Sequence, residues 1–227
     1  RKETDAPAIM SRLILLRHGQ ASFGADRYDA LSDIGRQQSE LVGSYFAERG
    51  QRFDRVHIGP RDRHRLTARY ALAPLGLDAN EAADPALDEF AEGQQILAAV
   101  EARVHQKLHG KDAARQYVHE IEGWADGRSV ISGVRPAEQF RATVVAWLAA
   151  VTADSAPGQT VLVVTSGGVI GATLAHVLNL PDASLAGFMG SIYNASLTEL
   201  AFSAGRAPSL VSFNVASYLP DAMLTRI

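Results

Sequence analysis

The sequence predicts an α/β fold: a three-layer sandwich in which helices cover both faces of a mostly parallel central sheet. Short apolar runs alternate with amphipathic segments along the 227 residues, and this order is typical of a parallel sheet. Two strand patterns, at residues 13–16 and within 160–168, end at a short turn that contains glycine, and a helical pattern follows each turn. Hydrophobic residues make up 47% of the chain, so a substantial core can form.

The first half of the chain predicts three strands and two helices. The first strand is expected at residues 13–16, and a helix at 31–50 follows it, with a glycine as its stop signal. A second strand is expected at 53–59. A short helix at 61–76 comes next and ends in proline and glycine. We expect a third, short strand at 86–90.

The second half repeats the opening design. Residues 138–153 predict a strong amphipathic helix, started by Pro136. The stretch 160–168 predicts a buried strand that runs straight into glycines, and residues 169–180 predict the helix that follows it.

The end of the chain predicts a β-hairpin on the sheet edge. Its two strands are expected at 191–203 and 208–217, with the turn at Gly205. We interpret residues 1–11 as an N-terminal tail and residues 12–227 as a single domain. Residues 91–135 are helix-prone and rich in charge, and we expect them to form a helical insertion over the active edge of the sheet.

The composition argues against several classes of protein. The net charge of −3 and the pI of about 6.2 are not typical of proteins that bind nucleic acids or membrane surfaces. No apolar run reaches the roughly 18 residues that a membrane-spanning helix needs, and the polar start lacks the apolar core of a signal peptide. We therefore expect a cytoplasmic protein with no nucleic-acid or membrane partner. The lack of cysteine excludes disulfides, thiolate catalysis and cysteine metal sites.

Polar residues gather where two buried strands end. Residues 17–19 (Arg-His-Gly) follow one strand, and residues 166–168 (Ser-Gly-Gly) follow the other. Ligands of open α/β sheets bind beyond the carboxyl ends of the strands. Glycine turns that lead into helices offer backbone N–H groups and the positive end of a helix dipole. Guanidinium groups match phosphate oxygens, and a neutral imidazole such as that of His18 can attack phosphorus. The pattern predicts a site for a phosphorylated ligand.

These motifs resemble the histidine phosphatase superfamily, also called phosphoglycerate mutase-like. "LLRHGQAS" is similar to its Arg-His-Gly motif, and "LSDIGRQQSELVG" to its next segment. "GPRDRHRLTARY" resembles its Ser-Pro-x-x-Arg-x-x-x-Thr-Ala helix, with Gly59 in the serine place. "PALDEF" is similar to its acidic segment and "VLVVTSGGVIGA" to its last catalytic loop. The five segments stand in the family's order within residues 12–180.

The resemblance implies a role for each matching residue. His18 would be the nucleophile that becomes phosphohistidine, and Arg17 and Arg63 would bind the phosphoryl group. Glu89 would be the general acid that protonates the leaving oxygen and then helps to activate water. The residues expected to bind phosphate are Arg17, Gln20, Arg63, Ser166 and Gly167.

Several positions leave alternatives open. Arg61, Arg65 and Arg69 compete with Arg63, and Asp88 and Glu92 compete with Glu89. The chain departs from the family at Ser166, where a second histidine usually contacts the phosphoryl group, and this serine also fits a simple turn or N-cap role. The remaining histidines are expected at the surface or in packing: His57, His64, His105, His109, His119 and His176.

The resemblance implies a phosphomonoesterase that works through a phosphohistidine on a small phosphorylated metabolite, and that is slow because of Ser166. We expect no cofactor and no metal, since no His-x-x-His or His-Glu-x-x-His pattern occurs. The alternative is a degenerate module that binds phosphorylated ligands. A phosphoglycerate mutase is a lesser alternative, because "QASFGADRYD" lacks the Trp-Asn pair of the mutases. The sequence does not identify the substrate, and it does not decide whether the protein forms a homodimer.

Overall fold

The computed structural model describes residues 9–22, 29–79, 83–203 and 206–226. The strands are β1 (Ser11–Arg17), β2 (Arg55–Ile58), β3 (Thr160–Thr165), β4 (Leu197–Phe202) and β5 (Ser209–Val215). The helices are α1 (Asp33–Glu48), α2 (Asp62–Leu72), α3 (Gly93–Val104), α4 (Gly110–Ala125), α5 (Ala137–Ala153), α6 (Gly167–Val177) and α7 (Ser184–Ser191). Short 3-10 helices occur at Ala73–Leu75, Pro85–Leu87 and Asp221–Met223.

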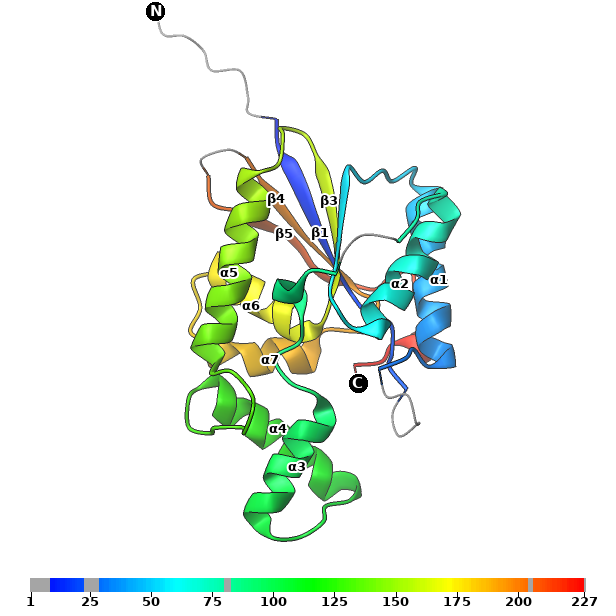
Figure 1. Cartoon of the computed structure of the whole chain (residues 1–227). Helices are drawn as coiled ribbons and strands as arrows, with labels where there is room; N and C mark the ends of the chain where they lie inside the picture. Colours follow the sequence, from blue (N-terminus) through cyan, green and yellow to red (C-terminus); the bar gives the residue numbers. More distant parts are fainter. Residues whose placement is uncertain (1–8, 23–28, 80–82, 204–205, 227) are drawn as a thin grey trace, which may run out of the picture.

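The strands form one mixed sheet between two layers of helices. The strand order is β2-β3-β1-β4-β5. β1 and β2 pair in parallel with β3, whereas β4 is antiparallel to both β1 and β5, so β4 alone runs against the other four. Helices α1 and α2 cover one face of the sheet, and α5 and α6 cover the other (Figure 1). The predicted three-layer α/β fold is confirmed, and the β4–β5 hairpin lies at the sheet edge. The predicted turn at Gly205 lies outside the described residues.

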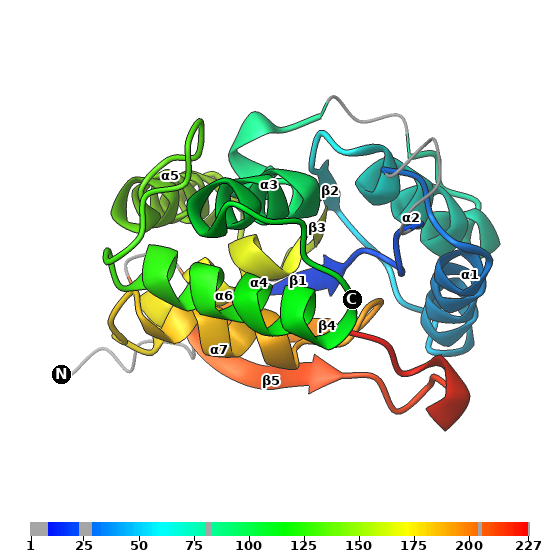
Figure 2. The ribbon, with the colours of Figure 1, turned by 90° about the horizontal axis from the view of Figure 1, so that it is seen from below.

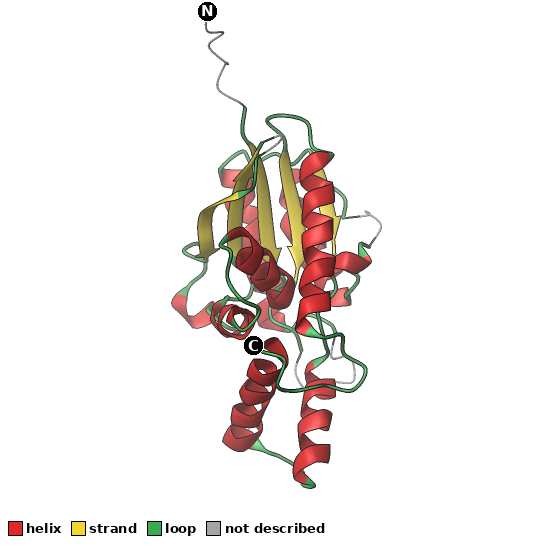
Figure 3. Cartoon of the chain, turned by 90° about the vertical axis from the view of Figure 1, so that its left-hand side faces the viewer, coloured by secondary structure: helices red, strands yellow, loops and turns green. Residues whose placement is uncertain are grey.

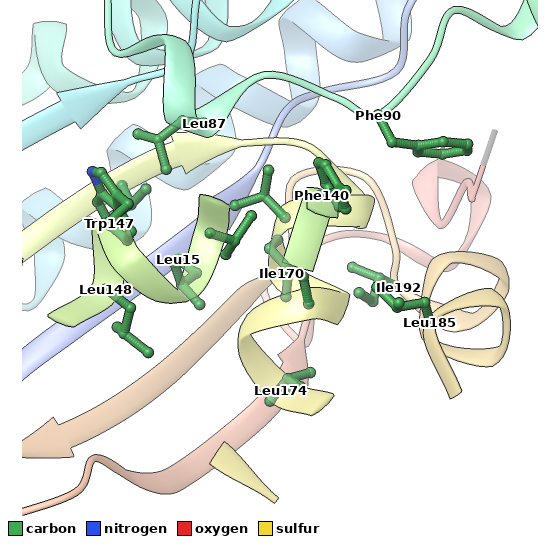
Figure 4. Packing of buried hydrophobic residues seen from close by; sticks show 14 of the residues in the cluster. Leu15, Leu87, Phe90, Phe140, Trp147, Leu148, Ile170, Leu174, Leu185 and Ile192 are labelled. Atoms are coloured by element: carbon green, nitrogen blue, oxygen red, sulfur yellow. The ribbon is translucent and has the colours of Figure 1, made fainter. Parts of the chain in front are cut away.

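Strand alternation divides the core into two clusters. Leu13 and Leu15 of β1 are fully buried against the helices on the α5–α6 side. Ile14 and Leu16 pack on the opposite face, against α1 and α2. Successive strand residues point to opposite faces, so the uninterrupted apolar run is what a strand covered on both sides requires. Figure 4 shows Leu15 and Phe140 in the first cluster.

The strand register brings three loops together at one end of the sheet. Arg17 pairs with Thr165 across β1 and β3, and Ile58 pairs with Val164 across β2 and β3. The segments that carry β1 and β3 stay paired beyond the end of β1, since the His18 amide donates to the Thr165 carbonyl at 2.9 Å. Helices α3 and α4 lie beyond this same end (Figures 2 and 3).

The prediction of a strand at residues 86–90 is wrong. Pro85–Leu87 forms a 3-10 helix, which begins where the Asp84 carboxylate accepts the amide of Ala86 at 3.0 Å. Proline has no N–H to give to a neighbouring strand, and the aspartate side chain stabilises a turn instead. In the described part of this segment, the pairing with the sheet is one bridge between Ile58 and Ala83.

Two other boundaries differ from the prediction. The strand predicted at 191–203 begins only at Leu197, because α7 extends to Ser191 and Ala195 adopts a φ of 55°. That left-handed conformation breaks an extended run. At the other end, Ser11 already belongs to β1, and its hydroxyl donates to the Ala156 carbonyl at 3.1 Å. The strand therefore begins inside the predicted tail.

Candidate active site

A pocket with a volume of about 170 Å³ opens at the carboxyl ends of β1 and β3. Its polar part is formed by Arg17 and His18 after β1, Arg63 of α2, Glu89, and Gly167 at the start of α6. These residues come from four separate segments of the chain. The sheet register and the start of α2 and α6 at this edge bring them together.

His18 has the properties of a nitrogen nucleophile. Its side chain is buried, and Nδ1 lies 2.7 Å from the Gly19 carbonyl oxygen. A carbonyl only accepts, so Nδ1 carries the proton and Nε2 carries the free electron pair. Burial, followed by the charges of Arg63 and Arg17, holds the pKa of His18 well below the ordinary value of 6.5. The imidazole is therefore neutral at neutral pH.

The two arginines of the pocket differ in their partners. Arg17 donates through Nη1 to the Ile192 carbonyl, while its buried Nε makes no hydrogen bond with any residue that the structure describes. Burial lowers the pKa of Arg17 to about 10, so the group stays charged. Arg63 donates to Asp29 at 2.6 Å and lies 3.7 Å from Glu92. A buried cation with an unused donor is stabilised by an anion that accepts from it.

Glu89 is fixed by backbone donors. One carboxylate oxygen accepts the amide of Phe90 at 3.0 Å, and the other accepts the amide of Gly168 at 3.3 Å. A Cβ atom at position 168 would lie 2.0 Å from Oε1 of Glu89. Glycine at this position therefore lets the carboxylate reach the start of α6.

The structure separates the alternatives that the sequence left open. Arg61 forms ion pairs with Asp88 and Glu92, and none of these three residues lines the pocket. Arg65 pairs with Asp62 at the surface at 3.5 Å. Arg69, the last of the competing arginines, does not line the pocket either. Among these arginines and carboxylates, Arg63 and Glu89 are the ones that line it.

Two residues predicted to bind phosphate lie outside the pocket lining. The side-chain oxygen of Gln20 accepts from Ser32 at 2.9 Å, and Ser32 is the N-cap of α1. Ser166 stands at the N-cap position of α6 but makes no capping bond. Its hydroxyl oxygen lies instead 2.6 Å from Nε2 of His64.

His64 is the residue that the sequence interpretation missed. It is fully buried, and its ring centroid lies 5.5 Å from that of His18. His57, by contrast, packs edge-on against Trp147 at 5.6 Å, as expected for a packing histidine. The available signal was that Gly59 and Ser166 both depart from the family pattern, and both turn out to contact His64.

The outer wall of the pocket is largely apolar, and α4 contributes to it. The apolar and aromatic residues of this wall are Phe90, Ala91, Tyr117, Val118, Ile121, Ala186 and Met189. Besides Arg17 and Arg63, the described residues that line the pocket include one more positively charged side chain, that of Arg226. It is exposed and lies over the ring of Tyr193 at 4.8 Å.

Within the described ranges, no cluster of three or more histidine, aspartate or glutamate side chains could hold a metal ion. No helix among the described residues is both long and apolar enough to cross a membrane.

Solved structures with the same fold include a phosphoglycerate mutase from Bacillus anthracis str. Sterne, with a TM-score of 0.67 and 17% identity over 93% of this chain and 96% of that chain. A mycobacterial glucosyl-3-phosphoglycerate phosphatase aligns with a TM-score of 0.65 and 23% identity over 90% and 99%. A phosphoserine phosphatase from Entamoeba histolytica aligns with a TM-score of 0.66 and 18% identity over 92% and 100%. No curated protein matches the chain. The family model of the histidine phosphatase superfamily (branch 1) matches residues 13–216, and the chain belongs to that family.

Proposed function

We propose that the protein is a metal-independent phosphomonoesterase that acts through a phosphohistidine at His18. The observation that carries the proposal is a neutral imidazole, with its Nδ1 proton fixed by the Gly19 carbonyl, beside the unused donor of Arg17. Phosphorus attack needs a free nitrogen pair and a positive field on the phosphoryl oxygens. Family membership supports the same chemistry.

The reaction has two steps. Nε2 of His18 forms a bond to phosphorus while the bond from phosphorus to the ester oxygen breaks, and Glu89, as the general acid, gives a proton to that oxygen. Glu89 then takes a proton from water as the water oxygen attacks phosphorus. The bond between phosphorus and Nε2 breaks, and inorganic phosphate and neutral His18 are regenerated. Arg17 and Arg63 balance the charge on the transferring group in both steps.

The apolar wall supports a small ester with an apolar or aromatic organic part. Phe90, Tyr117 and Met189 offer few hydrogen-bonding groups to the hydroxyls of a sugar. Leaving such hydroxyls unpaired in the pocket would cost binding free energy. We therefore rank aryl and alkyl phosphates above sugar phosphates as substrates.

One observation favours a second candidate, a module that binds phosphoesters with little turnover. The Ser166 hydroxyl is directed to His64 and does not line the pocket, so the phosphoryl site receives no side-chain donor from Ser166. A phosphoglycerate mutase has less support. A mutase must hold a second anionic group. Besides Arg17 and Arg63, the described lining residues offer one more positively charged side chain for that group, Arg226, and it is exposed.

Steady-state hydrolysis tests the proposal. The purified chain is assayed with p-nitrophenyl phosphate, naphthyl phosphate and glucose 6-phosphate, beside the His18→Asn variant. We expect turnover that His18→Asn abolishes, with a higher kcat/KM on the aryl esters. Binding of these esters without turnover would support the second candidate. Wild-type turnover by His18→Asn would overturn the nucleophile assignment.

A further inference from the structure

The peptide unit between Gly19 and Gln20 orients the imidazole of His18. Its carbonyl oxygen, on Gly19, lies 2.7 Å from Nδ1 of His18. Its N–H, on Gln20, donates to Oε1 of Gln38 at 2.8 Å. Glycine tolerates a wide range of backbone angles, so residue 19 alone does not fix the plane of this unit. Gln38 of α1, whose side chain is fully buried, therefore holds the plane that faces the imidazole.

Gln38 is in turn held by residues 223–226, which lie near the carboxyl end of β1 (Figures 1 and 2). Its Nε2 donates to the Met223 carbonyl at 2.6 Å and to Oγ1 of Thr225 at 2.9 Å. A backbone N–H only donates and a backbone carbonyl only accepts. The amide of Gln38 therefore has one orientation, with Oε1 toward Gln20 and Nε2 toward Thr225.

The Thr225 hydroxyl continues this pattern to Asn194. Because its oxygen accepts from Gln38, its hydrogen is donated to Oδ1 of Asn194 at 2.9 Å. Asn194 is buried, and its Nδ2 donates to the His18 carbonyl at 3.3 Å. The donations thus run in one direction from the Gln20 amide to the His18 carbonyl. They close a hydrogen-bonded ring around residues 18–20, which we call the His18 loop.

Both side-chain amides of the ring depend on the hydroxyl of Thr225. Without it, Oδ1 of Asn194 loses the hydrogen that it accepts, and Nε2 of Gln38 keeps the Met223 carbonyl. The Asn194 amide could then turn over, and its oxygen would face the His18 carbonyl, where two acceptors repel each other. The ring does not include the guanidinium groups of the pocket. Its loss should therefore change the placement of the imidazole and not the binding of phosphate.

We propose that Thr225 is a positioning residue that acts through the amides of Gln38 and Asn194 on the His18 loop. Its hydroxyl fixes the peptide units of the loop, keeps the imidazole proton on Nδ1 and directs Nε2 of His18 at phosphorus. Thr225 itself does not touch the substrate. The effect on rate rests on the proposed phosphohistidine chemistry, whereas the effect on the imidazole does not.

The pair Thr225→Val and Thr225→Ser separates the hydroxyl from packing. Valine has the shape of threonine without the hydroxyl, and serine keeps the hydroxyl. We expect Thr225→Val to lose about fivefold to thirtyfold in the single-turnover rate of p-nitrophenyl phosphate cleavage, since two hydrogen bonds to amides are removed. Thr225→Ser should stay close to the wild type. The inhibition constant of inorganic phosphate should be unchanged in both, because Arg17 and Arg63 are unaltered.

Thr152→Val is the control for the loss of a threonine hydroxyl elsewhere. The hydroxyl of Thr152 donates within α5, to the Leu148 carbonyl at 2.8 Å, and we expect no loss of rate when it is removed. Equal losses in Thr225→Val and Thr225→Ser would overturn the proposal. So would a weaker inhibition by phosphate with an unchanged cleavage rate in Thr225→Val, because that result would assign Thr225 to phosphate binding.

Nitrogen-15 NMR of the His18 imidazole tests the ring without turnover. The two ring nitrogens have different shifts according to which one carries the proton, so the spectrum reports the tautomer. We expect the Nδ1–H form in the wild type and in Thr225→Ser, and a mixture of both forms in Thr225→Val. Identical spectra in all three proteins would overturn the proposal. If the wild type cleaves no phosphate ester, the proposed function fails, and the NMR comparison alone then decides on the ring.

Discussion

The replacement Gly168→Ala tests how the start of α6 places Glu89. The added Cβ would lie 2.0 Å from Oε1, and ordinary contact begins at 3.4 Å, so the carboxylate oxygen must move by about 1.4 Å. The carboxylate can make this shift because it is the far end of a flexible side chain, although it then leaves the position that the two backbone amides hold. The movement also disturbs the hydrogen bond from the Gly168 amide, which is 3.3 Å long.

The expected cost falls on catalysis and not on folding. A misplacement of about 1 Å can cost on the order of a hundredfold in rate, and general acid catalysis contributes roughly 10²–10⁴-fold. We therefore expect kcat of Gly168→Ala to fall about tenfold to a hundredfold. Alanine is a better helix former than glycine by roughly 0.5–1 kcal/mol, so the melting temperature should not fall.

Gly167→Ala is the matched control. Its Cβ would first meet Nε of Arg17 at 3.6 Å, which is an ordinary contact, so Glu89 is not displaced. Both variants are assayed on an aryl phosphate with a good leaving group and on an alkyl phosphate with a poor one. The loss in Gly168→Ala should be larger on the alkyl ester, because that leaving oxygen needs the proton more. Equal losses on both esters would refute the assignment of Glu89 as the general acid.

Three further predictions concern pH, charge and metals. His18 and His64 have lowered pKa values in the folded protein, so the unfolded chain binds more protons than the folded one below pH 6.5. Stability should be full above pH 6.5 and should fall as the pH drops, by up to about 1.4 kcal/mol per pH unit for each histidine. Urea unfolding of the wild type and of His64→Gln checks this, and an identical pH slope in the two proteins would contradict it. Asp29→Asn removes a negative charge from the partner of Arg63 and keeps an acceptor oxygen. The inhibition constant for inorganic phosphate should fall about two- to fivefold, and an unchanged constant would show that Asp29 does not compete with the ligand. Hydrolysis should continue in EDTA; activity that is lost with EDTA and restored by Mg²⁺ or Zn²⁺ would contradict the metal-independent mechanism.

The sequence predicted those features that depend on strand ends. Two apolar strands that end in glycines must meet at one edge of a parallel pair, so His18 and Gly167 could be placed together before the structure was known. The choice of Arg63 and Glu89 came from the resemblance to the family. The structure places both in the pocket.

Features that depend on contacts between distant segments could not be predicted. His64 follows Arg63 directly and looked like part of a charged helix face, because helical periodicity does not show which loops approach the helix. Gln20 stood close to the motif histidine, but its carbonyl oxygen is bound by the N-cap serine of α1. The 3-10 helix at Pro85–Leu87 replaced a strand because a local side-chain bond from Asp84 outweighed strand propensity.

The central claim is that His18 carries the phosphoryl group between the two steps. Rapid-quench mixing with an aryl phosphate, followed by peptide mass spectrometry under alkaline conditions, measures it directly. We expect phosphate on the peptide that contains His18, formed at least as fast as steady-state turnover and absent in His18→Asn. Turnover with no phosphorylated peptide at any time point, or phosphate on another residue that forms at the catalytic rate, would contradict the account.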